Sequence, residues 1–251
     1  MLRRSLNSLP LACLTIALLS CSFLAAPAAA QNPTDPATLH VTLVKTKPGK
    51  SAVWRDTQRD LLRHYQESAK WPWVSVYAIR FGEASFAVIT DIANYDRTAK
   101  MPDGEMRRHQ VALNDSVEWT RTYVQYKLTE LSFGAPEEKP AAHVSVSNIT
   151  IAPDKRAAFI KTFKETLIPR WKKMGIPFVT TWEILYGENS GQFIVLAPFE
   201  KYADLNEGTP YFRGLSEAEL GQLMSGMQGV TVKVERNVGD YLEDLSHAAA
   251  Q

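Results

Sequence analysis

The chain has 251 residues, of which 45% are hydrophobic and 22% are charged, and 28 basic residues nearly balance 27 acidic ones. This composition is typical of a folded globular protein and excludes disordered, collagen-like and coiled-coil chains. It also argues against a nucleic-acid-binding surface, which needs an excess of clustered Lys and Arg.

The first 30 residues have the pattern of an export signal. Arg3 and Arg4 precede an apolar run over residues 9–24, and three small residues end the segment at Ala30. This order of charge, apolar core and small-residue cleavage site predicts a cleaved signal peptide and a periplasmic or secreted mature protein. An alternative is a lipoprotein anchored through Cys21, although the apolar run continues past that cysteine.

Two stretches of the chain share the same spacing of landmark residues. Pro48 and Pro72 are 24 residues apart, as are Pro153 and Pro177, and each second proline is followed ten residues later by a glycine. Chance agreement at so many spacings is improbable, so we expect an internal duplication.

The expected elements, in chain order, repeat as strand, helix, strand, strand, helix, strand. In the first copy the pattern predicts a strand over residues 39–46, a helix over 50–69, and strands over 73–81 and 86–91, followed by a helical region and a last strand. In the second copy it predicts a strand over 143–151, a helix with apolar residues at helical spacing, and strands over 178–186 and 193–196. The apolar residues of that helix are Phe159, Phe163, Leu167 and Trp171. A second helix is predicted from Glu217, with Ser216 and Glu219 as its capping box, and the alternation of Val230, Val232 and Val234 predicts the closing strand.

This order is that of an α+β ferredoxin-like βαββαβ unit, present twice. The expected organisation is a signal peptide (1–30), a linker (31–38), a first unit (39–133), a Pro-containing linker (134–141), a second unit (142–245) and a tail (246–251). The strand over 73–81 is apolar on both faces, as is its counterpart over 178–186. Helices cover one face, so the sister sheet is expected to cover the other and form a barrel.

In each copy the first helix begins just after a proline turn, at Pro48 and at Pro153, and a later hairpin has the pattern aromatic-Gly-Glu, in Phe81-Gly82-Glu83 and in Tyr186-Gly187-Glu188. With these features the chain resembles the dimeric α+β barrel superfamily in its tandem form. That superfamily includes cofactor-free oxygenases, haem enzymes, isomerases and proteins without an assigned activity. The resemblance therefore implies the architecture and leaves the reaction open.

Candidate catalytic residues are few. Glu183 interrupts an apolar strand, where a buried carboxylate needs an ion-pair partner or a function as a general base or ligand anchor. Arg80 lies on the matching strand of the other copy, and His64 on the first helix has Asp60 and Glu67 at metal-ligand spacing. For His64 a solvated helix surface is the simpler reading, so no metal is expected.

Aromatic residues give a second set of candidates, for ligand binding. Tyr77 and Trp182 belong to a matched aromatic stripe, which is usual for packing but is also suited to an apolar ligand. Tyr211 and Arg213 lie in a glycine-flanked loop that would suit a lid. The second copy has no helical histidine for an axial haem ligand, and we expect no cofactor.

Three functions follow as hypotheses. The first is an exported protein that binds a small apolar or aromatic molecule; the second is an oxygenase-like or isomerase-like enzyme; the third is a structural envelope module without a ligand. The expected partner is a small molecule rather than a nucleic acid, with no membrane span in the mature chain, which would be a monomer with an internal pseudo-dimer or a homodimer.

Overall fold

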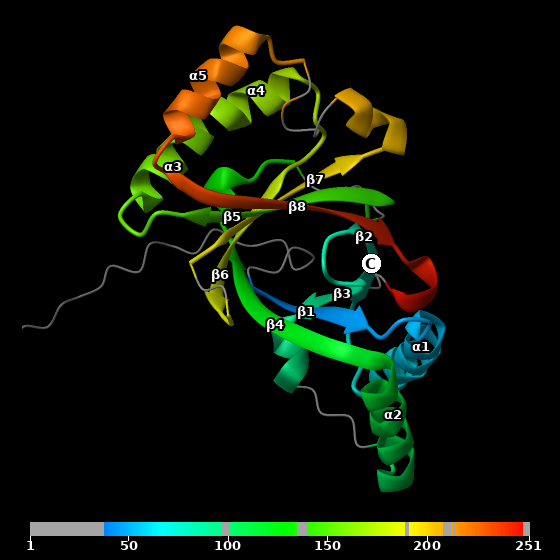
Figure 1. Ribbon diagram of the computed structural model, residues 1–251. Helices are drawn as coiled ribbons and strands as arrows, with labels where there is room; N and C mark the ends of the chain where they lie inside the picture. The colour runs from blue at the N-terminus through cyan, green and yellow to red at the C-terminus, as the bar shows by residue number, and fades with distance from the viewer. Residues whose placement is uncertain are drawn as a thin grey trace, which may run out of the picture. The chain divides into compact units, whose positions relative to one another are not determined.

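Eight antiparallel strands close into a barrel in this computed structural model, which describes residues 38–96, 101–134, 140–188, 191–207, 212 and 214–247 (Figure 1). The first half contains β1 (Thr38–Thr46), α1 (Ser51–Ser68), β2 (Val74–Phe81), β3 (Phe86–Asp91), α2 (Asp103–Ser116) and β4 (Val117–Lys127). The second contains β5 (His143–Ile151), α3 (Arg156–Thr162), α4 (Ile168–Lys173), β6 (Thr180–Tyr186), β7 (Phe193–Phe199), α5 (Glu217–Met227) and β8 (Thr231–Tyr241). The predicted βαββαβ order is thus found in both halves.

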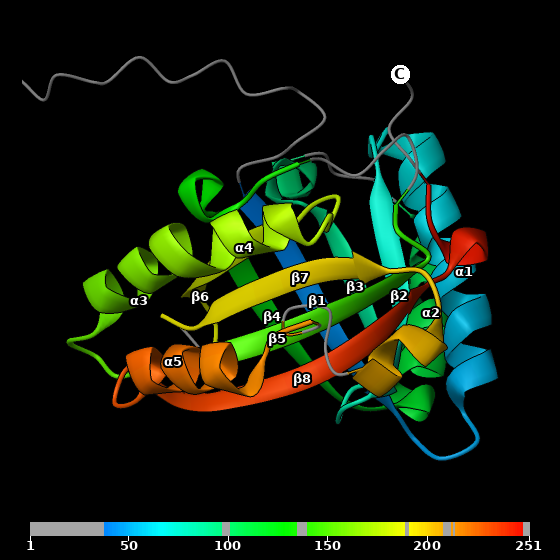
Figure 2. The ribbon, with the colours of Figure 1, turned by 90° about the horizontal axis from the view of Figure 1, so that it is seen from above.

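Short helical turns connect these elements. They are η1 (Ile92–Asp96), η2 (Thr129–Leu131), the π-helical η3 (Phe163–Leu167), η4 (Tyr202–Glu207) and η5 (Glu243–Leu245). The order around the barrel is β1-β3-β2-β8-β5-β7-β6-β4, so each half contributes four adjacent strands. Helices α3, α4 and α5 lie over the strands of the second half, as Figure 2 shows.

Strand β2 is buried on both faces over most of its length, as its apolar pattern predicts. On β2, Val74 and Val76 pack outward with Trp54 of α1, whereas Tyr77 points into the barrel beside Val144 of the other half. Side chains from both halves fill the barrel interior, which explains why neither face of this strand is polar.

Two seams join the halves into one barrel. β2 pairs with β8 and β4 pairs with β6, both antiparallel. The twin hairpin glycines lie at these seams with positive φ: Gly82 (φ 126°) beside Asn237 of β8, and Gly187 (φ 120°) beside Thr122 of β4. A Cβ at Gly187 would lie 2.6 Å from the backbone oxygen of Thr122, so this close approach requires glycine.

The predicted helix through Phe159 and Trp171 is interrupted by a π turn. Residues Phe163–Leu167 form η3, and Pro169 follows at the start of α4. Pro169 has no N–H to donate to the carbonyl of Glu165, and its ring would crowd that carbonyl in a regular α-helix. The chain therefore widens to a π turn in the preceding residues.

The predicted capping box at the start of α5 is confirmed. The Ser216 hydroxyl accepts a hydrogen bond from the Glu219 backbone N–H, and the Glu219 carboxylate accepts one from the Ser216 backbone N–H. Arg170 of α4 donates to the same carboxylate at 2.8 Å. The hydrogen bond from Arg170, followed by those from Ser216, lowers the pKa of Glu219 to about 2.

The predicted signal peptide (1–30), most of the first linker and residues 135–139 of the second lie outside the described residues. These assignments, and the common origin of the two halves, stay predictions. Within the described part of the chain, none of the helices combines the length and the apolar character needed to cross a bilayer.

Replacing Gly187 by Ala should destabilise the barrel by about 3 kcal/mol, because overpacking against β4 adds to an unfavourable φ. Gly191→Ala is the matched control: Gly191 also has a positive φ, but a Cβ there meets nothing within 4 Å, so only about 1 kcal/mol should be lost. Urea unfolding of the three proteins measures both values. Equal losses would show that the seam tolerates a side chain.

The anchoring of α5 should depend on pH. A carboxylate whose folded-state pKa is depressed adds stability above its ordinary value and loses it as the pH falls through the folded-state value. For Glu219 this window runs from about pH 4.5 down to about pH 2. The stability advantage of the unmodified protein over Glu219→Gln should shrink across that window. Glu217→Gln, which leaves the capping box and its hydrogen bond from Arg170 in place, is the control in the same helical turn. Unfolding curves at several pH values test this, and a pH-independent difference for Glu219→Gln would contradict it.

Candidate functional site

A cavity of about 580 Å³ lies between the helices of the second half and the outer face of its sheet. Ser147 and Ile149 of β5 and Val195 of β7 form its floor, and Leu223 and Met227 of α5 contribute its roof. Its size falls within the range of about 300–1,000 Å³ that is usual for small-molecule sites.

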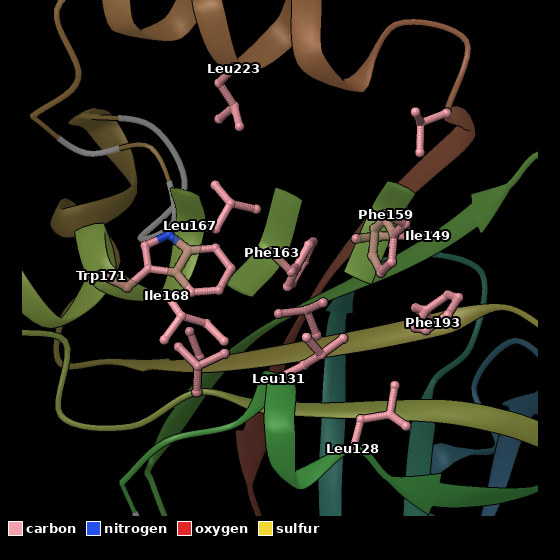
Figure 3. Close-up of a cluster of buried hydrophobic side chains, with 14 residues drawn as sticks. Leu128, Leu131, Ile149, Phe159, Phe163, Leu167, Ile168, Trp171, Phe193 and Leu223 are labelled. Carbon is pink, nitrogen blue, oxygen red and sulfur yellow. The ribbon is translucent and has the colours of Figure 1, made fainter. Parts of the chain in front are cut away.

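The π turn shapes one wall of this cavity. Phe163, Leu167 and Trp171 follow one another at four-residue spacing and all line it. Figure 3 shows Leu223 pointing down from α5 toward Leu167 and Phe163. Phe163 and Trp171 also meet edge to face at 5.5 Å between ring centroids, so two aromatic rings support each other in the wall.

Strand β8 forms an apolar rim. Val232 and Val234 line the cavity, as does Met224 of α5, and all three are exposed large apolar side chains. Val232 is 68% exposed and Met224 is 59% exposed. A cluster of such side chains beside a cavity is typical of a surface that is covered when something binds.

The polar atoms of the cavity are also on the second half. The polar and charged lining residues are Ser147, Ser225, Gln228, Thr231, Lys233 and Arg236. The Thr231 hydroxyl is buried without a hydrogen-bond partner. The Arg236 guanidinium lies 5.5 Å from the ring centroid of Phe212, which lines the cavity as well.

Glu183 lies in an ion pair with Arg156 at the start of α3. The guanidinium donates twice, from Nε to Oε1 at 3.0 Å and from Nη2 to Oε2 at 2.6 Å. Hydrogen bonding to Glu183 raises the pKa of Arg156 against the opposing effect of burial. The glutamate side chain is 16% exposed, so this bidentate pair satisfies a largely buried carboxylate. Of the two explanations offered for Glu183, an ion-pair partner or a functional role, this geometry fits the ion pair. Glu183 is not among the described residues that line the cavity.

Arg80 is paired elsewhere, with Asp240 across the β2–β8 seam. Asp240 also accepts hydrogen bonds from the Tyr202 hydroxyl at 2.5 Å and from His143 Nδ1 at 2.8 Å. Burial acts to raise the pKa of Asp240, but these three hydrogen bonds outweigh it and hold the pKa below its ordinary value. The structure thus gives Arg80 and Glu183 separate partners and does not bring them together.

His64 lies on α1 in the first half, far along the chain from the cavity residues. Its Nε2 atom is buried without a hydrogen-bond partner. Asp60, one of its predicted companions, pairs instead with Arg63 at 3.7 Å. Among the described residues there is no group of three His, Cys, Asp or Glu side chains that could hold a metal ion.

The aromatic candidates Tyr77 and Trp182 lie inside the barrel. Tyr77 meets Tyr241 edge to face at 5.5 Å between centroids, and burial raises its pKa well above the ordinary value. Trp182 packs with Tyr123 and Ile184. Neither lines the cavity. The other two ligand-binding candidates, Tyr211 and Arg213, lie outside the described residues.

Sequence reasoning missed Arg236, although a signal was present. Val232 and Val234 alternate along the closing strand, and Arg236 continues the same phase with a cation. It stands opposite Ser147 in the register of β8 with β5, which places it on the face that carries the cavity.

Comparisons with known proteins identify the fold. No family model matches the chain, and no curated protein matches it in sequence. Among solved structures, a putative monooxygenase from Fusobacterium nucleatum is 9% identical and superposes with a TM-score of 0.58 over 82% of this chain and 92% of its own. A putative monooxygenase from Lactobacillus acidophilus is 7% identical, with a TM-score of 0.52 over 86% of this chain and 98% of its own.

An anthrone oxidase-like protein is 9% identical, with a TM-score of 0.53 over 85% of this chain and 93% of its own. At such low identity these likenesses establish the architecture alone. The chain has the fold of the ferredoxin-like dimeric α+β barrel proteins, as the resemblance in its sequence implied.

Proposed function

We propose that this protein binds a small, mainly apolar molecule in the cavity of its second half. The observation that carries the proposal is the cavity itself, with a volume of about 580 Å³ and a lining dominated by Phe163, Trp171 and aliphatic side chains. Burial of apolar ligand surface against such a lining contributes about 25 cal/mol per Å². The few polar lining groups would orient the ligand rather than supply most of the affinity.

A monooxygenase-like reaction is the second candidate. It is favoured by the names of two solved structures with this fold, which are putative monooxygenases, and of a third, which is anthrone oxidase-like. Binding of an apolar molecule is common to both candidates. Oxygen-dependent turnover of the bound molecule would distinguish the enzyme from a binding protein.

We also propose that binding takes place outside the cytoplasm, since the first 30 residues have the pattern of an export signal.

The neutral fluorescent probe phenylnaphthylamine should bind to the cavity, and Ser147→Leu should weaken binding about tenfold because the larger side chain fills the floor. Thr42→Leu is the control. Thr42 occupies the same place in β1 as Ser147 does in β5, but it is not a cavity residue. Fluorescence titration measures both affinities, and mass spectrometry of co-purifying molecules identifies natural ligands. A protein that neither binds the probe nor carries any small molecule would instead fit a structural module.

Export predicts a mature chain that begins near Gln31. Mass spectrometry of the protein from an extracytoplasmic fraction should give that terminus, and a lipid-modified Cys21 would instead identify the lipoprotein alternative. Recovery of the chain only from the cytoplasm, with residues 1–30 intact, would refute export.

A further inference from the structure

The charges of the cavity indicate what kind of apolar molecule it takes, if the proposed binding function holds. Both charged residues in its described lining, Lys233 and Arg236, are cationic. An apolar cavity with a cation at its edge favours a ligand with an anionic group, because burial of that group near the cation offsets its loss of hydration.

Of the two cations, Arg236 is the one available to a ligand. Lys233 already forms an ion pair with Glu235 at 2.7 Å. In the described part of the chain, Arg236 has no carboxylate partner, and its guanidinium lies over the face of the Phe212 ring. Stacking on an aromatic ring leaves the edge of a guanidinium free to donate two parallel hydrogen bonds to a carboxylate or a similar oxyanion.

The neighbouring acid does not cancel this charge. Glu235 directly precedes Arg236 on β8, and consecutive strand residues point to opposite faces of the sheet. Its ion pair with Lys233 follows the same alternation, since the two are separated by one residue. Arg236 instead shares its face with Val234, which is apolar.

The arrangement along β8 implies an elongated ligand. Thr231 and Arg236 both line the cavity, and five residues of strand separate them by roughly 16 Å. Between them lie the exposed side chains of Val232 and Val234, with Met224 of α5 also on the rim. An apolar body lying along this edge would cover side chains that are otherwise in water.

We infer that the cavity binds an elongated apolar molecule with a single anionic head, such as a carboxylate, with the head on Arg236 and the body along β8 toward Thr231. The Thr231 hydroxyl, buried without a partner, marks the far end of the cavity's β8 wall, where one further polar atom of the ligand would be tolerated.

Calorimetric titration with dodecanoate and with its neutral counterpart dodecanol tests the head group. The unmodified protein should bind dodecanoate roughly tenfold more tightly than the alcohol, as expected for a hydrogen-bonded charge. Arg236→Gln should abolish that preference and leave the affinity for dodecanol within about twofold. Arg63→Gln, an exposed arginine on α1 in the other half, should change neither value.

Comparison of decanoate with dodecanoate tests the elongated body. Each added methylene that becomes buried should tighten binding about fourfold, so that the two-carbon difference gives about fifteenfold. Equal affinities for the two acids, equal affinities for acid and alcohol, or an Arg236→Gln variant that retains the acid preference would overturn the inference. Because phenylnaphthylamine is neutral, its binding would still uphold the proposed function in those cases, whereas failure of all four probes would overturn both.

Discussion

The structure depends on strands that are apolar on both faces. Such a strand cannot leave either face in water, so one face packs under helices and the other needs a second apolar surface. In this chain the second surface comes from the other half: Tyr77, Val144 and Tyr241 pack together inside the barrel although they belong to three different strands. The closed barrel therefore sets the positions of the helices, the seams and the cavity.

Closure places demands on individual residues at the seams. The hairpin glycines come so close to the opposite half that a side chain there would overlap its backbone or a side-chain amide. The Asp240 network joins Arg80 of the first half to His143 and Tyr202 of the second across one seam. Charged residues in otherwise apolar strands thus form ion pairs that join separate elements. Glu183 does the same, because it accepts two hydrogen bonds from Arg156 at the start of α3.

The cavity depends on how the backbone of the second half departs from a regular helix beside the barrel. Pro169 prevents a regular helix, the preceding residues form a π turn, and Phe163, Leu167 and Trp171 come to line one wall. Helix α5, held by the capping box and by Arg170, supplies the roof. Apolar side chains make up most of the lining of the space between them, and β8 presents Arg236 at its edge. The proposed ligand is therefore one that fits a wall of aromatic rings at one side and the guanidinium of Arg236 at the edge.

Hydrophobic periodicity, turn residues and capping signals lie within short stretches of the chain, and they determined the order of the elements and the bounds of several, including β3, β5 and the start of α5. The apolar residues on both faces of the strand around Tyr77 also indicated a barrel, because any tertiary structure has to remove both of these faces from water. The partners of Glu183 and Arg80 were decided only by the tertiary structure, since Arg156 and Asp240 are 27 and 160 residues away from them in the chain. The same holds for the cavity: it is space left between an irregular helix, a capped helix and a sheet, and no local pattern records how closely three separate elements approach one another.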